Sequence, residues 1–85
     1  MKTTQFTETR GRYAITVEIY DSPTDIMIDF YAREYDLRDL FARIIFDKQS
    51  EFAPSLRKCG LRKYLIADAY GGDAGIIDYA RRLIS

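Results

Sequence analysis

The sequence predicts a single α+β domain in which a small, mainly antiparallel sheet carries helices on one of its faces. Two consecutive segments, 12–21 and 25–33, alternate apolar and polar residues, which is the pattern of half-buried strands. Two later segments, 36–50 and 73–84, repeat apolar residues every three or four positions, which is typical of helices. The chain of 85 residues is long enough for one domain and too short for two. The expected order of elements is (β)-β-β-α-β-α.

The strands at the start of the chain form the clearest pattern. Threonines surround Phe6 in the first ten residues, which favours an edge strand that pairs with the segment after it. In segment 12–21 one face carries Tyr13, Ile15, Val17 and Ile19. Residues 21–24, Asp-Ser-Pro-Thr, have turn chemistry, because proline restricts φ and aspartate or serine can bond the local backbone. Segments 12–21 and 25–33 therefore predict an antiparallel hairpin.

The period changes at Asp36. The apolar residues after it recur every three or four positions, as on one face of a helix: Leu37, Leu40, Phe41, Ile44 and Ile45. We therefore expect a helix over 36–50 with Asp36 as its N-cap. Pro54 near the start and Gly60 at the end of segment 54–60 indicate a single helical turn.

The last third of the chain contains one ambiguous segment and one clear helix. Residues 61–70 fit a strand or a helix, and the glycines on both sides of this short apolar run favour the strand. Asp73 is then expected to cap the final helix. The apolar stripe of that helix comprises Ile76, Ile77, Ala80, Leu83 and Ile84.

Composition excludes several classes of function. The 13 basic and 13 acidic residues cancel, which removes the usual electrostatic case for a nucleic-acid binder or a membrane-surface protein. The chain has no histidine, so Ser-His and Cys-His catalysis and imidazole metal sites are excluded. Cys59 is the only cysteine, and no apolar run approaches the roughly 20 residues that span a bilayer. We therefore expect a cytoplasmic, non-catalytic protein that needs no metal or cofactor.

Tyrosine is the most informative residue type for binding. The period of two places Tyr20 and Tyr31 on the strand face opposite the apolar stripe, together with Met27 and Asp29, and Tyr35 follows in a connection. Tyrosine and methionine are enriched in protein interfaces. These five residues predict a surface that binds another protein, with a homodimer as an alternative. A small inhibitor or accessory protein of phage or mobile-element type, such as an anti-CRISPR protein, would suit this size and composition.

A basic segment provides the competing hypothesis. Arg57, Lys58, Arg62 and Lys63 lie close together in the sequence, with Tyr64 beside them. Cations with an adjacent aromatic ring can bind nucleic acid through phosphate contacts and base stacking. The alternative function is therefore a nucleic-acid-binding domain that uses residues 57–63.

Overall fold

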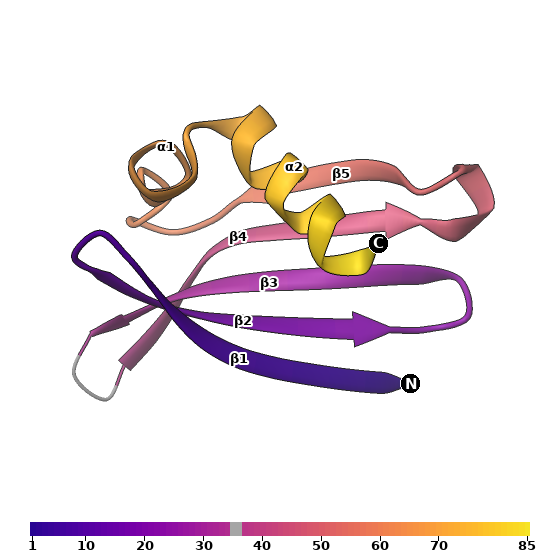
Figure 1. Ribbon diagram of the computed structural model, residues 1–85, viewed down its shortest axis with the longest axis horizontal. Coiled ribbons are helices and arrows are strands. Elements are labelled where there is room, and N and C mark those ends of the chain that lie inside the picture. Colours follow the sequence, from indigo (N-terminus) through magenta and orange to yellow (C-terminus); the bar gives the residue numbers. More distant parts are fainter. Residues whose placement is uncertain (35–36) are drawn as a thin grey trace.

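The computed structural model describes residues 1–34 and 37–85, so Tyr35 and Asp36 lie outside the described residues. Five strands form one antiparallel sheet in which neighbours in sequence are also neighbours in space (Figure 1). The elements are β1 (Lys2–Arg10), β2 (Tyr13–Asp21), β3 (Asp25–Glu34), β4 (Leu37–Asp47), the short 3₁₀ helix η1 (Lys48–Ser50), β5 (Ala53–Lys58), α1 (Leu65–Tyr70) and α2 (Asp73–Ile84). The predicted α+β class with an antiparallel sheet is confirmed.

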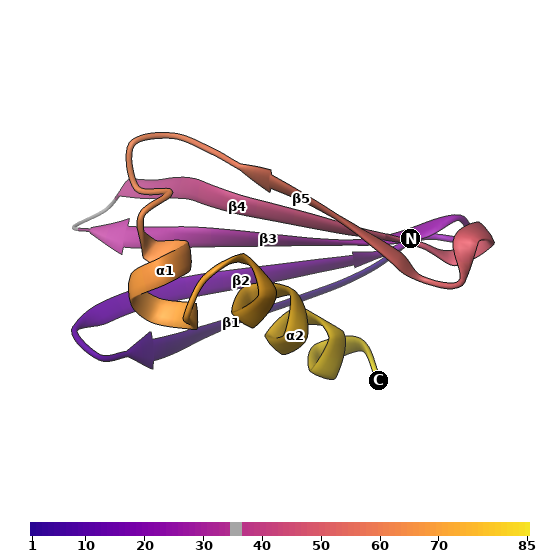
Figure 2. The ribbon, with the colours of Figure 1, turned by 90° about the horizontal axis from the view of Figure 1, so that it is seen from above.

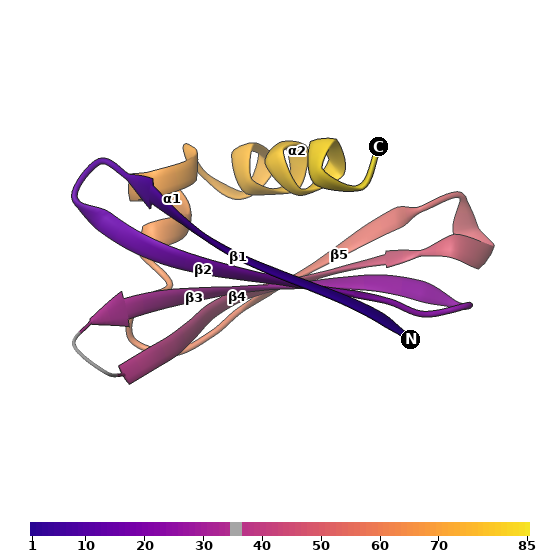
Figure 3. The same ribbon diagram turned by 60° about the horizontal axis from the view of Figure 1, so that its bottom comes forward.

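Both helices pack on the same face of the sheet, as predicted (Figure 3). Seen from above, α1 lies near the β1–β2 turn and α2 extends from there towards the opposite end of the sheet (Figure 2). The core between the two layers contains Phe30, Phe41 and Phe46, all with no exposed surface, and Ile76 from α2. Because side chains alternate along a strand, every second residue points away from this core. Those residues form a second sheet face on which neither helix lies.

The predicted hairpin and the predicted first strand are both present. Strand β2 pairs with β3 so that Val17 faces Phe30, and β1 pairs with β2 so that Phe6 faces Val17. The turn between β2 and β3 is closed by a hydrogen bond of 3.0 Å from the backbone N–H of Ser22 to the carbonyl oxygen of Asp25.

The helix predicted for 36–50 is wrong, because from residue 37 the segment is strand β4. Phe30 pairs with Ala42 while Tyr31 pairs with Leu40, so Phe41 is an extra residue at a β-bulge. The bulge places Phe41 and Ala42, which are adjacent in sequence, both in the core. Strand β4 also carries apolar residues on its other face. Together these features produce apolar spacing that imitates a helix.

The single helical turn predicted for 54–60 is also wrong, because Ala53–Lys58 is strand β5. Pro54 is tolerated there because β5 is an edge strand, where a missing N–H costs little. The strand favoured for 61–70 is corrected too, since residues 65–70 form helix α1. In this helix Leu65, Ile66 and Tyr70 are buried against the sheet. The helical alternative therefore describes the second half of that segment.

The final helix is confirmed, but Asp73 is its first residue rather than its cap. Gly72 occupies the N-cap position with a φ of 110°, and no side chain caps the helix. The Asp73 carboxylate instead pairs with the Lys58 ammonium group at 2.8 Å. Ile76 and Ala80 are the fully buried members of the predicted apolar stripe.

Candidate functional site

The sheet face opposite the helices, called the open face below, is the first candidate site. Its side chains form five rows that run across the strands. The register places in these rows Asp25, Asp47 and Ala53; Thr3, Tyr20, Met27, Ile45 and Ser55; Gln5, Glu18, Asp29, Arg43 and Arg57; Thr7, Thr16, Tyr31 and Leu40; and Thr9, Ala14, Arg33 and Arg38. Apolar and aromatic side chains therefore lie on both sides of a charged row.

The charged row has its carboxylates on β2 and β3 and its arginines on β4 and β5. Glu18 and Asp29 face each other directly, an arrangement that is destabilising for unpaired like charges. Arg43 compensates Asp29 through two hydrogen bonds of 2.7 and 2.9 Å. Arg38 lies 3.6 Å from Glu18. Among the described residues, no buried side-chain nitrogen or oxygen atom lacks a hydrogen-bond partner. The two carboxylates of this row are thus each paired with an arginine.

Two tyrosines lie over these carboxylates. The Tyr31 hydroxyl donates a hydrogen bond to Asp29 at 3.3 Å, and the Arg38 guanidinium lies 4.8 Å from the centroid of the Tyr31 ring. Burial, followed by the negative charges of Asp29 and Glu18, raises the pKa of Tyr31 to about 12. Burial and the charge of Glu18 also raise the pKa of Tyr20. Both phenols therefore stay neutral at physiological pH and present a ring with a polar group.

The charges of the open face balance in number. Its described residues include four arginines, Arg33, Arg38, Arg43 and Arg57, and four carboxylates, Asp25, Asp47, Glu18 and Asp29. Arg38 and Arg43 are engaged by two of those carboxylates. Arg33 and Arg57 are exposed and form no ion pair with any other residue that the structure describes. Two guanidinium groups therefore point to solvent at the edges of the face.

The structure brings four of the five residues predicted for protein binding together on the open face. Tyr20 and Met27 are direct cross-strand neighbours, and Tyr31 lies two residues from Asp29 on the same strand. Asp29 has an exposed fraction of 1%, so it supports the face rather than offering a contact. The fifth residue, Tyr35, lies outside the described residues.

The side chains that β4 contributes to the open face are not among the residues predicted from the sequence. Arg38, Arg43 and Ile45 complete three of its rows. Their omission follows from the incorrect helix prediction for 36–50. A half-buried strand alternates polar and apolar residues, but Ile45 is apolar where residues 43–46, Arg-Ile-Ile-Phe, should have a polar residue. The sequence of this segment therefore does not indicate a strand.

The basic segment predicted for nucleic acid does not form one surface. Arg57 belongs to the open face. Lys58 pairs with Asp73, and Arg62 pairs with Asp39 at 3.1 Å. Lys63 and Tyr64 are exposed in the turn before α1. The five residues therefore do not share one surface, although Arg62 and Tyr64 line the same pocket, and two of the four cations are bound by carboxylates.

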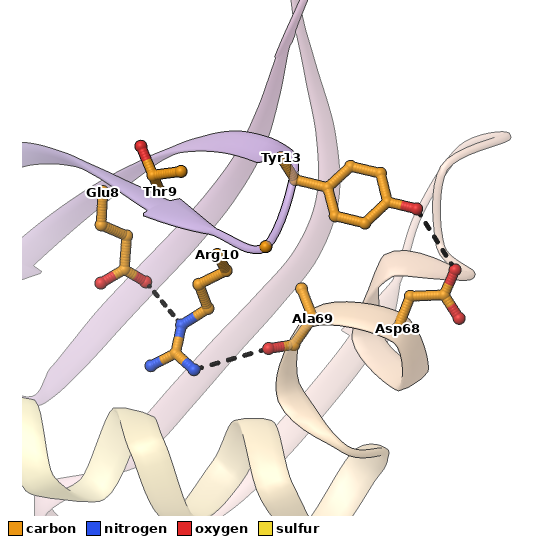
Figure 4. Close-up of a pocket in the computed structure, with 7 residues that line it drawn as sticks. Glu8, Thr9, Arg10, Tyr13, Asp68 and Ala69 are labelled. Atoms are coloured by element: carbon orange, nitrogen blue, oxygen red, sulfur yellow. Dashed lines mark hydrogen bonds and ion pairs between the residues drawn. The ribbon is translucent and has the colours of Figure 1, made fainter.

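A further charged cluster fastens β1 to the helices (Figure 4). Arg10 lies 4.4 and 4.3 Å from the ring centroids of Tyr70 and Tyr79, and it donates to Glu8 at 3.1 Å and to the Ala69 carbonyl at 3.5 Å. The Tyr70 hydroxyl donates to Glu8 at 2.8 Å, and the Tyr79 hydroxyl donates to its other oxygen. Burial would raise the pKa of Glu8, but the hydrogen bonds from Tyr79, Tyr70 and Arg10 outweigh it and lower that pKa. These groups satisfy one another, which indicates a structural role.

Comparison with known proteins finds no family model, no curated protein and no solved structure that matches the chain. Within residues 1–34 and 37–85, no three acidic or cysteine side chains are grouped closely enough to bind a metal ion. Neither of the two helices in the described part of the chain is long and apolar enough to cross a membrane.

Proposed function

We propose that this chain is a non-catalytic protein-binding module whose open face binds an acidic surface of a partner protein. The observation that carries the proposal is the grouping of Tyr20, Met27 and Tyr31 on adjacent strands of a face that the helices leave uncovered. Aromatic residues and methionine supply large contact areas, and tyrosine adds a hydrogen-bonding group.

The choice of cation on the open face supports a protein interface. All its basic side chains in the described part of the chain are arginines, and none is lysine. Arginine is enriched in protein interfaces and lysine is depleted, because the planar guanidinium is less strongly hydrated and makes paired hydrogen bonds. The bidentate contact of Arg43 with Asp29 further reduces the conformational freedom of the face before any partner binds.

The charge of the face indicates the chemistry of the partner. Arg33 and Arg57 lie at the margins, where they can pair with carboxylates on an opposing surface. Met27 on β3 and Ile45 on β4 are direct cross-strand neighbours, and their apolar side chains would contact an apolar patch on the partner. A partner with an apolar patch and acidic residues around it fits both features. A small cytoplasmic inhibitor or accessory protein, including one of phage or mobile-element type, would act through such a contact.

The proposal is tested by capturing partners with the tagged chain from lysate of the source cell, with and without nuclease. Three proteins are compared: the unchanged chain, the double variant Tyr20→Ala/Tyr31→Ala, and Tyr64→Ala. Tyr64 is 48% exposed, lies in the turn before α1 and belongs to none of the rows of the open face, so its variant is a matched control for loss of a tyrosine. Circular dichroism establishes that each variant is folded.

We expect a stoichiometric protein that survives nuclease treatment, is retained by Tyr64→Ala and is lost with the double variant. Equal capture by all three proteins would show that the open face is not the binding surface. Loss of every captured protein after nuclease treatment would contradict the proposal and favour nucleic acid as the partner.

A further inference from the structure

A second candidate site lies at the end of the sheet, where the turn before α1 approaches the start of β2 and the end of β3. Here a pocket of about 310 Å³ is lined by Arg12, Tyr13, Ala14, Ala32, Arg33, Arg62 and Tyr64. This volume lies at the lower end of the range of about 300–1,000 Å³ that is usual for small-ligand sites. The two alanines come from adjacent strands, and their small side chains leave the space open.

Arginines are the main charged groups among the described residues of the pocket. Three of the seven described residues that line it are arginines, and none of these seven is acidic. Arg12 and Arg33 are exposed, and neither forms an ion pair with the rest of the described chain. Arg62 forms an ion pair with Asp39, which does not line the pocket, at 3.1 Å between Nε and Oδ2. Guanidinium groups that converge in this way bind the oxygens of phosphate through paired hydrogen bonds.

Two aromatic rings accompany these cations. Arg12 lies 5.4 Å from the centroid of the Tyr13 ring and donates to the Tyr13 hydroxyl at 3.4 Å. That hydroxyl donates in turn to Asp68 at 3.4 Å, a contact visible in Figure 4. Arg12 is thereby positioned over a ring that is itself anchored to α1. Tyr64 is 48% exposed, so one side of its ring is open to stacking by a planar group.

We propose that this pocket binds the phosphate of a nucleotide, with Arg12 and Arg33 contacting the phosphate oxygens and Tyr64 stacking on the base. The arginines alone would accept any small oxyanion, and the exposed ring beside them adds the preference for a planar aromatic group. The pocket shares Arg33 with the margin of the open face, but Tyr20, Met27 and Tyr31 do not line it, and the proposal does not depend on the function proposed for that face. The ligand is either a mononucleotide or the phosphorylated end of a nucleic-acid strand, since both present the same chemistry.

Isothermal titration calorimetry of the intact chain tests the proposal with four probes: adenosine monophosphate, inorganic phosphate, adenosine and a short 5′-phosphorylated oligonucleotide. We expect adenosine monophosphate to bind at least tenfold more tightly than phosphate or adenosine alone. Tighter binding of the oligonucleotide would identify a strand end as the ligand, and tighter binding of the mononucleotide would identify the small molecule. Either result supports the site.

Variants separate this pocket from general attraction between charges. Arg12→Glu should weaken binding of adenosine monophosphate by at least tenfold, and Tyr64→Ala should reduce it to the level of inorganic phosphate. Arg57→Glu is the matched control, because Arg57 is an exposed arginine on β5 outside the pocket. The proposal is overturned if no probe binds, if phosphate binds as tightly as the nucleotide, or if Arg57→Glu is as harmful as Arg12→Glu. Because Arg12 and Tyr64 are exposed, both variants should retain the circular dichroism spectrum of the unchanged chain.

Discussion

Arg43 donates two hydrogen bonds to Asp29, from Nε to Oδ1 at 2.7 Å and from Nη2 to Oδ2 at 2.9 Å. The side chain of Asp29 is 2% exposed, whereas that of Arg43 is 32% exposed. The contact therefore joins β3 to β4 beneath the surface of the open face. The hydrogen bonds to Asp29 raise the pKa of Arg43, which remains charged. Bidentate pairs of this kind are among the stronger polar contacts in proteins and also restrict geometry.

Replacing Arg43 by methionine should lower the free energy of unfolding by about 3 kcal/mol, because a buried carboxylate would lose its cation. Methionine retains much of the apolar part of the arginine side chain, so the loss of stability reflects mainly the removal of the positive charge. Urea unfolding followed by circular dichroism measures the effect. Arg57→Met, on the neighbouring strand, is the control and should change stability by less than about 0.5 kcal/mol. Similar values for the two variants would show that the Asp29 pair contributes little to the fold.

Gly75 should not tolerate alanine, although alanine is the better helix former by about 1 kcal/mol. A Cβ atom at this position would lie 1.9 Å from the carbonyl oxygen of Tyr70, so α1 and α2 would have to separate. We expect Gly75→Ala to destabilise the protein by about 1–3 kcal/mol, the usual cost of overpacking. Asp78→Ala, on the exposed side of α2, is the control in the same thermal unfolding experiment. A Gly75→Ala variant as stable as the unchanged chain would contradict this close approach.

The cluster around Glu8 should make stability depend on pH. Its folded pKa is lowered below the ordinary value of 4.5, so the folded state favours the carboxylate. At pH 7 the free energy of unfolding of the unchanged chain should be about 1–2 kcal/mol higher than that of the Glu8→Gln variant. This advantage is fully present above pH 4.5 and should disappear as the pH falls through the lower folded pKa.

Urea unfolding of both proteins between pH 7 and pH 3 measures the Glu8 effect. Glu51→Gln, an exposed position in the β4–β5 connection, controls for the loss of one negative charge. A difference between the unchanged chain and Glu8→Gln that stays constant over this range would mean that the charge of Glu8 is not what fastens β1 to the helices.

The parts of the fold that sequence predicted are those in which local pattern and tertiary structure agree. In β2 and β3 only one face is apolar, so alternation identifies the strands, and the proline-containing turn between them confirms the hairpin. Helix α2 packs through a single stripe, so its period is equally clear. Strand β4 has the apolar residues Leu40 and Ile45 on its outer face and a bulge at Phe41, and both features obscure the period of two.

The residues of the two proposed binding surfaces could also be predicted only where local pattern determines their position. The hairpin register was sufficient to place Tyr20, Met27 and Tyr31 on one face, because that register depends only on β2 and β3. The arginines of β4 could not be assigned to the face while β4 was read as a helix. The pocket at the end of the sheet joins Arg12, Arg33 and Tyr64, which lie in three separate segments of the sequence. Only the tertiary fold brings these segments together.

Binding of the protein partner should depend weakly on salt. Tyr20, Met27 and Tyr31 flank a charged row whose carboxylates are already paired within the chain, and only the marginal arginines, Arg33 and Arg57, would pair with the partner in solvent. We expect the affinity to fall by less than about tenfold between 50 and 200 mM salt, whereas binding that relies on many phosphate contacts falls by about 10³–10⁵ over that interval. Surface plasmon resonance with the captured partner measures the slope, and a steep one would contradict a tyrosine-centred protein interface.

The most direct test of the open face uses the two methionines of the chain. Met27 lies on β3, the middle strand of the face, beside Tyr20, and Met1 is 87% exposed at the start of the chain. Methionine labelled with ¹³C at the methyl group therefore provides one probe of the face and one reference. On titration with the captured partner we predict that the methyl resonance of Met27 shifts in proportion to complex formation while that of Met1 stays in place. A Met27 resonance that does not move when the complex is fully formed would contradict the account, because the partner would then bind elsewhere.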